Sequence, residues 1–127
     1  ADLDPARATE VAERHGIPQV CTVDELLTHP SVEVIVNLTP ASVHETVIRA
    51  ILESGKHAFS EKPLGVDRAG AGALVDLAAG RGLRLGRRGK VCHGRLSRWV
   101  DVAGNSGCGT LPVAANITAK NKKTSEG

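Results

Sequence analysis

VEVIVNLTP, residues 32–40, is a nearly continuous apolar run that ends at a Thr-Pro turn. A strand that is buried on both faces of a parallel sheet has this pattern, because helices cover both of its faces. A helix is predicted next, over about residues 41–54, because Val43, Val47 and Ile51 recur at helical spacing before Gly55. A second strand is predicted at residues 57–60. Together they indicate a strand–helix–strand unit.

The same alternation extends to both sides of this unit. Asp4 and Pro5 open a first helix that Gly16 closes, and one face of it is formed by Ala8, Val11, Ala12 and His15, which recur at helical spacing. A capping box at residues 22–25 starts a short helix, and Asp67 caps a longer one that leads to a brief strand at residues 83–85. Strands and helices that alternate over short links predict an α/β fold, a doubly wound, Rossmann-like parallel sheet.

Residues 87–127 break the pattern. No period of 2 or 3.6 is sustained over residues 87–109, although residues 111–117 have the composition of a strand. We therefore predict a partial dinucleotide-binding domain at residues 1–86, and an irregular basic segment at residues 87–127 that contains one possible strand.

Composition excludes several classes of protein. The net charge is only +2 and aromatic residues make up 2%. The basic tail therefore lacks aromatic rings interleaved among its charges to stack on bases, which argues against a nucleic-acid partner. Three cysteines without metal-type spacing indicate neither disulfides nor a metal site. No apolar run reaches the ~20 residues of a membrane span. We expect a soluble, cytoplasmic protein.

Ligands of doubly wound sheets bind beyond the carboxyl ends of the strands. Three groups of residues are predicted there. Asp2 precedes the first helix, where a carboxylate can accept both hydroxyl protons of an adenosine ribose and repel a 2′-phosphate. The other two groups follow the predicted strands and comprise Leu38, Thr39, Pro40 and His44, and Glu61, Lys62 and Pro63. Taken singly, each group is better explained without a ligand, as a capping residue, an ordinary turn or a solvated charge pair.

The combination of Leu38-Thr39-Pro40, His44, Gly55-Lys56-His57 and Glu61-Lys62-Pro63 resembles the Gfo/Idh/MocA family of NAD(P)-dependent oxidoreductases. The resemblance implies hydride transfer between a nicotinamide cofactor and a sugar, polyol or related metabolite. It implies that Thr39, Pro40, His44 and Glu61 line the cofactor cleft and that Lys62 contacts substrate as the catalytic residue. With Asp2 on the ribose, NAD is preferred to NADP. A homo-oligomer of the full-length protein is also compatible with the family.

The chain departs from the family pattern in three places. We expect the fold to be truncated before the family's Gly-rich first strand–helix unit, and the second, substrate-binding domain to be essentially absent. Ala41 stands where the family often carries an asparagine. Residues 87–109 are similar to no part of the family, as a local change of reading frame would produce. A noncatalytic fragment or interaction module that retains part of the nucleotide-binding fold is therefore the alternative hypothesis.

Overall fold

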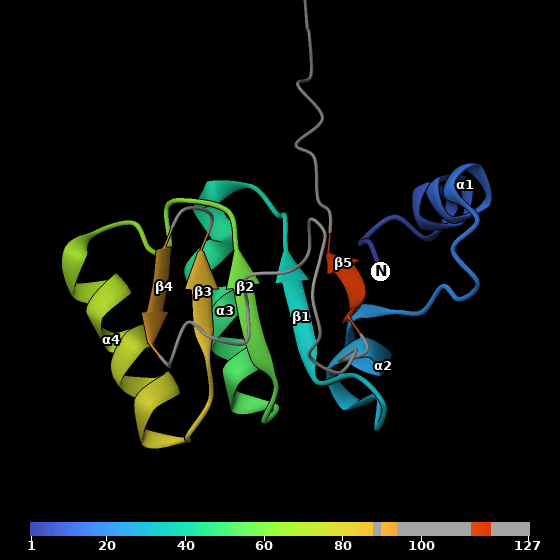
Figure 1. Ribbon diagram of the computed structural model, residues 1–127. Coiled ribbons are helices and arrows are strands. Elements are labelled where there is room, and N and C mark those ends of the chain that lie inside the picture. The colour runs from blue at the N-terminus through green and yellow to red at the C-terminus, as the bar shows by residue number, and fades with distance from the viewer. Residues whose placement is uncertain (88–89, 94–112, 118–127) are drawn as a thin grey trace, which may run out of the picture.

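A mainly parallel sheet forms the centre of the molecule (Figure 1). The computed structural model describes residues 1–87, 90–93 and 113–117. Its strands are β1 (Val34–Asn37), β2 (His57–Ser60), β3 (Leu85–Arg87), β4 (Lys90–His93) and β5 (Val113–Ile117), in the order β4-β3-β2-β1-β5. The pairs β1–β2, β2–β3 and β1–β5 are parallel, and β3–β4 is antiparallel. This is the Rossmann-like arrangement that the sequence predicted.

The helices begin and end at residues whose side chains or backbones suit those positions. They are α1 (Pro5–His15), α2 (Val23–Thr28), the 3-10 turn η1 (Ala41–Val43), α3 (His44–Glu53) and α4 (Arg68–Gly80). Asp4, Thr22 and Asp67 accept backbone N–H bonds at the starts of α1, α2 and α4, as predicted. Gly16 ends α1 in the left-handed conformation, with φ of 63°. Within the described ranges, no helix combines the length and apolarity needed to cross a bilayer.

The hydrophobic core lies between the sheet and the helices α3 and α4, which cover the same face (Figure 1). Ile35, Ala58 and Leu85 are aligned across β1, β2 and β3 and are fully buried on this face. The helices contribute Ile48, Ile51, Leu52, Leu74 and Ala78 to the same cluster. On the opposite face the aligned residues Val36 and Phe59 are only half-buried. The α3 and α4 side therefore supplies most of the apolar burial that stabilises the sheet.

The start of β1 is held by a buried lysine. Lys56 is only 8% exposed, and its Nζ donates to the carbonyl oxygens of His29 and Val32, at 2.7 Å in both cases. These bonds use two of the three donors of the ammonium and join the residues that follow α3 to the segment between α2 and β1. The strand that leads to the predicted turn at Thr39 is thus fixed at its beginning.

Three local expectations differ from the structure. The strand predicted at residues 83–85 begins at Leu85, because Leu83 N donates to Ala78 O at 2.8 Å and so belongs to the turn that ends α4. The segment expected to be irregular contains β4, whose four residues are too few to show a period. The expected apolar face of α1 is buried only at Ala12, and Val11 is 38% exposed, because α1 stands beyond β5, away from α3 and α4 (Figure 1).

Candidate functional site

The carboxyl ends of β1 and β2 carry a pair of buried polar side chains. Asn37 and Ser60 are aligned in the parallel register, and neither is exposed. Asn37 Nδ2 donates to Ser60 Oγ at 3.2 Å, and the backbone N–H of Glu61 donates to Asn37 O, also at 3.2 Å. Buried polar groups are stable only when they are hydrogen-bonded, and here each bonds to the other strand. The loops that follow β1 and β2 therefore start next to each other, at the same edge of the sheet.

Hydrogen bonds continue from this pair into both loops. The backbone N–H and the hydroxyl of Thr39 donate to Asn37 Oδ1, at 3.1 and 2.7 Å. The Ser60 hydroxyl donates to Glu61 O at 3.0 Å. Thr39 is itself buried, at 7% exposure. Its hydroxyl therefore serves to fix the Thr-Pro turn against Asn37.

His44 joins the two loops directly. Its imidazole is 2% exposed, and its nitrogens lie 2.5 Å from Pro63 O (Nδ1) and 2.7 Å from Thr39 O (Nε2). Both partners only accept, so the ring donates to at least one of them in either neutral tautomer and to both when it is doubly protonated. The expectation that His44 presents its imidazole to a cleft changes accordingly, because both nitrogens face backbone carbonyls and the ring is buried.

The remaining residues predicted on the two loops are accessible to different degrees. Leu38, Pro40 and Glu61 are half-buried, whereas Lys62 and Pro63 are exposed. The Lys62–Pro63 peptide bond is cis. The structure thus brings the Thr39 and Glu61 loops together through Asn37, Ser60 and His44, and leaves the Lys62 side chain open to solvent. The exposed Lys62 can donate hydrogen bonds to a small polar molecule at this edge of the sheet.

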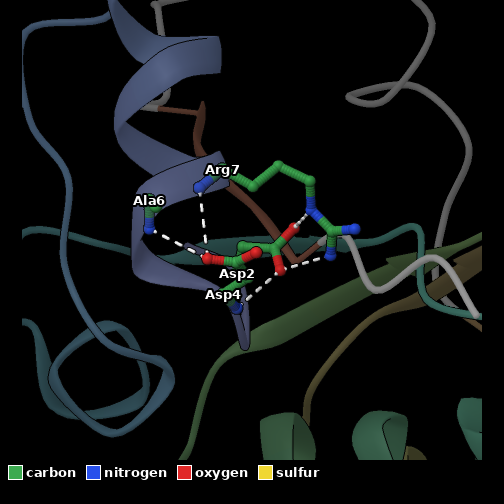
Figure 2. Close-up of polar contacts among 4 residues, drawn as sticks. All are labelled: Asp2, Asp4, Ala6 and Arg7. Atoms are coloured by element: carbon green, nitrogen blue, oxygen red, sulfur yellow. Dashed lines mark hydrogen bonds and ion pairs between the residues drawn. The ribbon is translucent and has the colours of Figure 1, made fainter. Parts of the chain in front are cut away.

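Asp2 lies before α1 and is fixed by a separate set of contacts (Figure 2). Its Oδ1 accepts from the backbone N–H of Asp4 at 2.9 Å, and its Oδ2 accepts from Arg7 Nε, also at 2.9 Å. Burial raises the pKa of the Asp2 carboxyl, but the hydrogen bonds from Arg7 and Asp4 and the positive charge of Arg7 outweigh this effect and leave the pKa below its ordinary value. Asp2 is therefore a buried, ionised carboxylate.

Three residues that organise these groups, namely Asn37, Ser60 and Arg7, were given no role of their own from the sequence. Asn37 and Ser60 carried a signal, since each is a polar residue at the last position of an apolar strand, and parallel pairing of equal-length strands places such residues opposite each other. Arg7 carried no such signal. It lies in the first turn of α1, five residues after Asp2, and an arginine at such a position is usually a solvated charge. Within the described ranges, no three His, Cys, Asp or Glu side chains gather as a metal site would require.

The arrangement can hold a dinucleotide along one edge of the sheet. Carboxyl ends of parallel strands are the usual ligand edge of doubly wound folds, and the loops after β1 and β2 are both anchored there. Asp2 retains an ionised oxygen that can accept a hydrogen bond from a sugar hydroxyl. Asp2 could thus hold a ribose hydroxyl, and the two anchored loops could contact other parts of such a ligand.

Comparison with known proteins gives a consistent match over this part of the chain. The oxidoreductase family with an NAD-binding Rossmann fold, known as GFO_IDH_MocA, matches residues 1–87. Trans-1,2-dihydrobenzene-1,2-diol dehydrogenase of Oryctolagus cuniculus is 40% identical over 86 residues, which are 67% of this chain and 26% of that protein. A dTDP-3,4-didehydro-2,6-dideoxy-alpha-D-glucose 3-reductase of Streptomyces antibioticus is 37% identical over 82 residues, 65% of this chain and 25% of that protein.

Solved structures agree with these matches. GenD2 from gentamicin A biosynthesis, in complex with NAD, has a TM-score of 0.61 and 32% identity over 66% of this chain and 24% of its own. The UDP-N-acetylglucosamine 3-dehydrogenase GnnA from Acidithiobacillus ferrooxidans has a TM-score of 0.61 and 34% identity over 68% of this chain and 28% of its own. The chain thus spans about a quarter of the length of the relatives it matches.

The bridge made by His44 predicts a large stability loss on substitution. His44→Phe keeps the volume of the ring but leaves the carbonyls of Thr39 and Pro63 without their buried partner. We expect the free energy of unfolding in urea to fall by about 2–4 kcal/mol, from one to two unsatisfied buried groups. Val43→Ala, one residue earlier and 40% exposed, is the control and should change it by less than about 0.5 kcal/mol. Equal effects of the two substitutions would contradict the bridging role.

Proposed function

Because this chain belongs to the Gfo/Idh/MocA family of oxidoreductases with an NAD-binding Rossmann fold, we propose that it forms one wall of the active site of an NAD-dependent dehydrogenase. The enzyme would transfer hydride between the nicotinamide and a hydroxyl-bearing carbon of a sugar, polyol or related metabolite. The observation that carries this proposal is the joining of the Thr39 and Glu61 loops at one edge of a parallel sheet by Asn37, Ser60 and His44.

Each predicted contact has support in the geometry. Asp2 would accept a ribose hydroxyl, since it is ionised and its position is fixed. Leu38, Thr39 and Pro40 would form the wall against which the cofactor lies, with Glu61 and Pro63 facing them from the neighbouring loop. His44 would act as a positioning residue that holds both loops, without touching the cofactor through its nitrogens.

Lys62 is the residue proposed to handle the substrate. When bound, the nicotinamide supplies or accepts the hydride. The exposed ammonium of Lys62 would donate a hydrogen bond to the reacting oxygen of the substrate and stabilise negative charge on it as the hydride moves. In the direction of alcohol oxidation, the hydroxyl proton would leave through the same amine. The positive charge of Lys62 would thus lie beside the substrate oxygen on which negative charge develops.

The relatives support the substrate class at a coarse level. A diol dehydrogenase and a nucleotide-sugar reductase are among them, and both names specify oxidation or reduction at a carbon that carries oxygen. We propose a substrate of this class, chosen by parts of the protein outside the part of the chain that the structure describes.

The first test is cofactor binding to the chain itself. Calorimetric titration with NADH should give saturable binding with one site per chain, because the wall that it would contact is already assembled. Heat that stays at the level of dilution up to millimolar NADH would contradict the cofactor proposal for this chain. It would favour the alternative, a noncatalytic piece that retains only part of the nucleotide-binding fold.

The second test concerns Lys62 in the full-length protein. Lys62→Ala should lower kcat by about 10²–10⁴, the usual contribution of a positioned acid or base, and leave NADH affinity within about threefold. Arg68→Ala removes an exposed positive charge from the start of α4 and should leave kcat nearly unchanged. Turnover by the Lys62 variant that equals that of the Arg68 control would reject the catalytic role.

A further inference from the structure

The position of Lys62 is set by its backbone, because its side chain is exposed. The neighbouring residues are held on both sides. The backbone N–H of Glu61 donates to the last residue of β1 at 3.2 Å. The carbonyl oxygen of Pro63 lies 2.5 Å from His44 Nδ1, and Leu64 is 7% exposed and belongs to the hydrophobic core. The loop that carries Lys62 is thus anchored before and after that residue.

Gly65 continues this anchored segment and lies against the first turn of α4. It is buried. A Cβ atom at this position would lie 2.9 Å from the backbone nitrogen of Ala71 and 3.3 Å from the carbonyl carbon of Gly70. Non-bonded heavy atoms prefer separations of about 3.5–4.0 Å, and a helix backbone cannot turn aside as a side chain does. A side chain at residue 65 would therefore force the loop and the helix apart.

Gly70 provides a contrast within the same turn of α4. A Cβ atom there would meet the carboxylate of Glu45, which projects from the first turn of α3. The Glu45 side chain is 33% exposed, and its carboxylate lies 3.7 Å from Arg49 Nη2 in a surface pair. Such a pair contributes little stability, so the carboxylate can move toward solvent at small cost. Crowding at Gly70 is thus relieved by a side chain, whereas crowding at Gly65 has to move backbone.

We propose that Gly65 is a positioning residue for Lys62. Because residue 65 lacks a side chain, the loop after β2 rests directly on the backbone of α4, while His44 holds the same loop at Pro63. These two contacts set where the Lys62 backbone lies. The proposal rests on the proposed function, in which Lys62 handles the substrate, and adds the residue that sets the position of Lys62. Precise placement matters because a displacement of about 1 Å can cost about 10² in rate.

Residual dipolar couplings of the ¹⁵N-labelled chain test this placement directly, because the coupling of the Lys62 N–H reports the orientation of its peptide plane. In Gly65→Ala, the couplings from Glu61 to Leu64 should change beyond the measurement error, and the urea midpoint should fall. Gly72→Ala is the matched control. It makes the same substitution on α4 at an exposed glycine with nothing within 4 Å of the added Cβ, and should leave these couplings unchanged.

Gly70→Ala separates backbone crowding from crowding in general. It should shift the resonances of Glu45 and leave the Lys62 coupling as in the wild type. A folded Gly65→Ala variant with an unchanged Lys62 coupling would overturn the proposal, and so would equal changes in Gly65→Ala and Gly70→Ala. The wild-type chain gives a test that needs no variant to fold. A strong nuclear Overhauser effect is expected between a Gly65 Hα and the amide proton of Ala71, and its absence would also overturn the proposal.

The proposed function and this inference fail in different ways, because the couplings need neither cofactor nor substrate. In the full-length protein, Gly65→Ala should lower kcat by about 10–10² and leave NADH affinity within about threefold. If Lys62→Ala lowers kcat but Gly65→Ala does not, the positioning role of Gly65 is contradicted. If neither variant lowers kcat, the proposed role of Lys62 fails.

Discussion

The buried imidazole of His44 is the constraint on which the rest of the site depends. It bonds to the backbone of the loop after β1 and to that of the loop after β2, so both loops are fixed relative to the first turn of α3. Behind it, the side chains of Asn37 and Ser60 bond to each other at the ends of the two strands. The sheet core places the strands, these polar contacts place the loops, and the exposed Lys62 follows from the loop that His44 holds.

Much of this architecture followed from elementary patterns. The apolar run at residues 32–40, the caps at Asp4, Thr22 and Asp67, and the glycine after α1 each reflect a local physical requirement, and each appears where it was predicted. Local requirements are readable because they depend on neighbours a few residues away. The strand at residues 113–117 was also indicated by composition, but its pairing with β1 depends on distant residues and could not be predicted.

What could not be predicted depends on contacts across the fold. A histidine in the first turn of a helix is normally exposed, and only the approach of Pro63 and Thr39 turns His44 into a buried bridge. Arg7 is similar. It donates hydrogen bonds to both carboxylate oxygens of Asp2, so Asp2 has fewer free acceptor sites than the two ribose hydroxyls predicted for it would need. In both cases the sequence indicated the correct region, and the hydrogen-bond geometry determined the role of the residue.

The most direct test of the account is to locate the bound cofactor on this chain by NMR. A ¹⁵N-labelled sample titrated with NADH should show its largest amide shifts at Thr39, Glu61 and Lys62, which follow β1 and β2, and at the Asp2–Arg7 segment. Amides on the far side of the core, in the middle of α4, should be unaffected. Shifts concentrated away from these loops, or no shifts at millimolar NADH, would contradict the claim that the loops joined by His44 form a wall of the cofactor site.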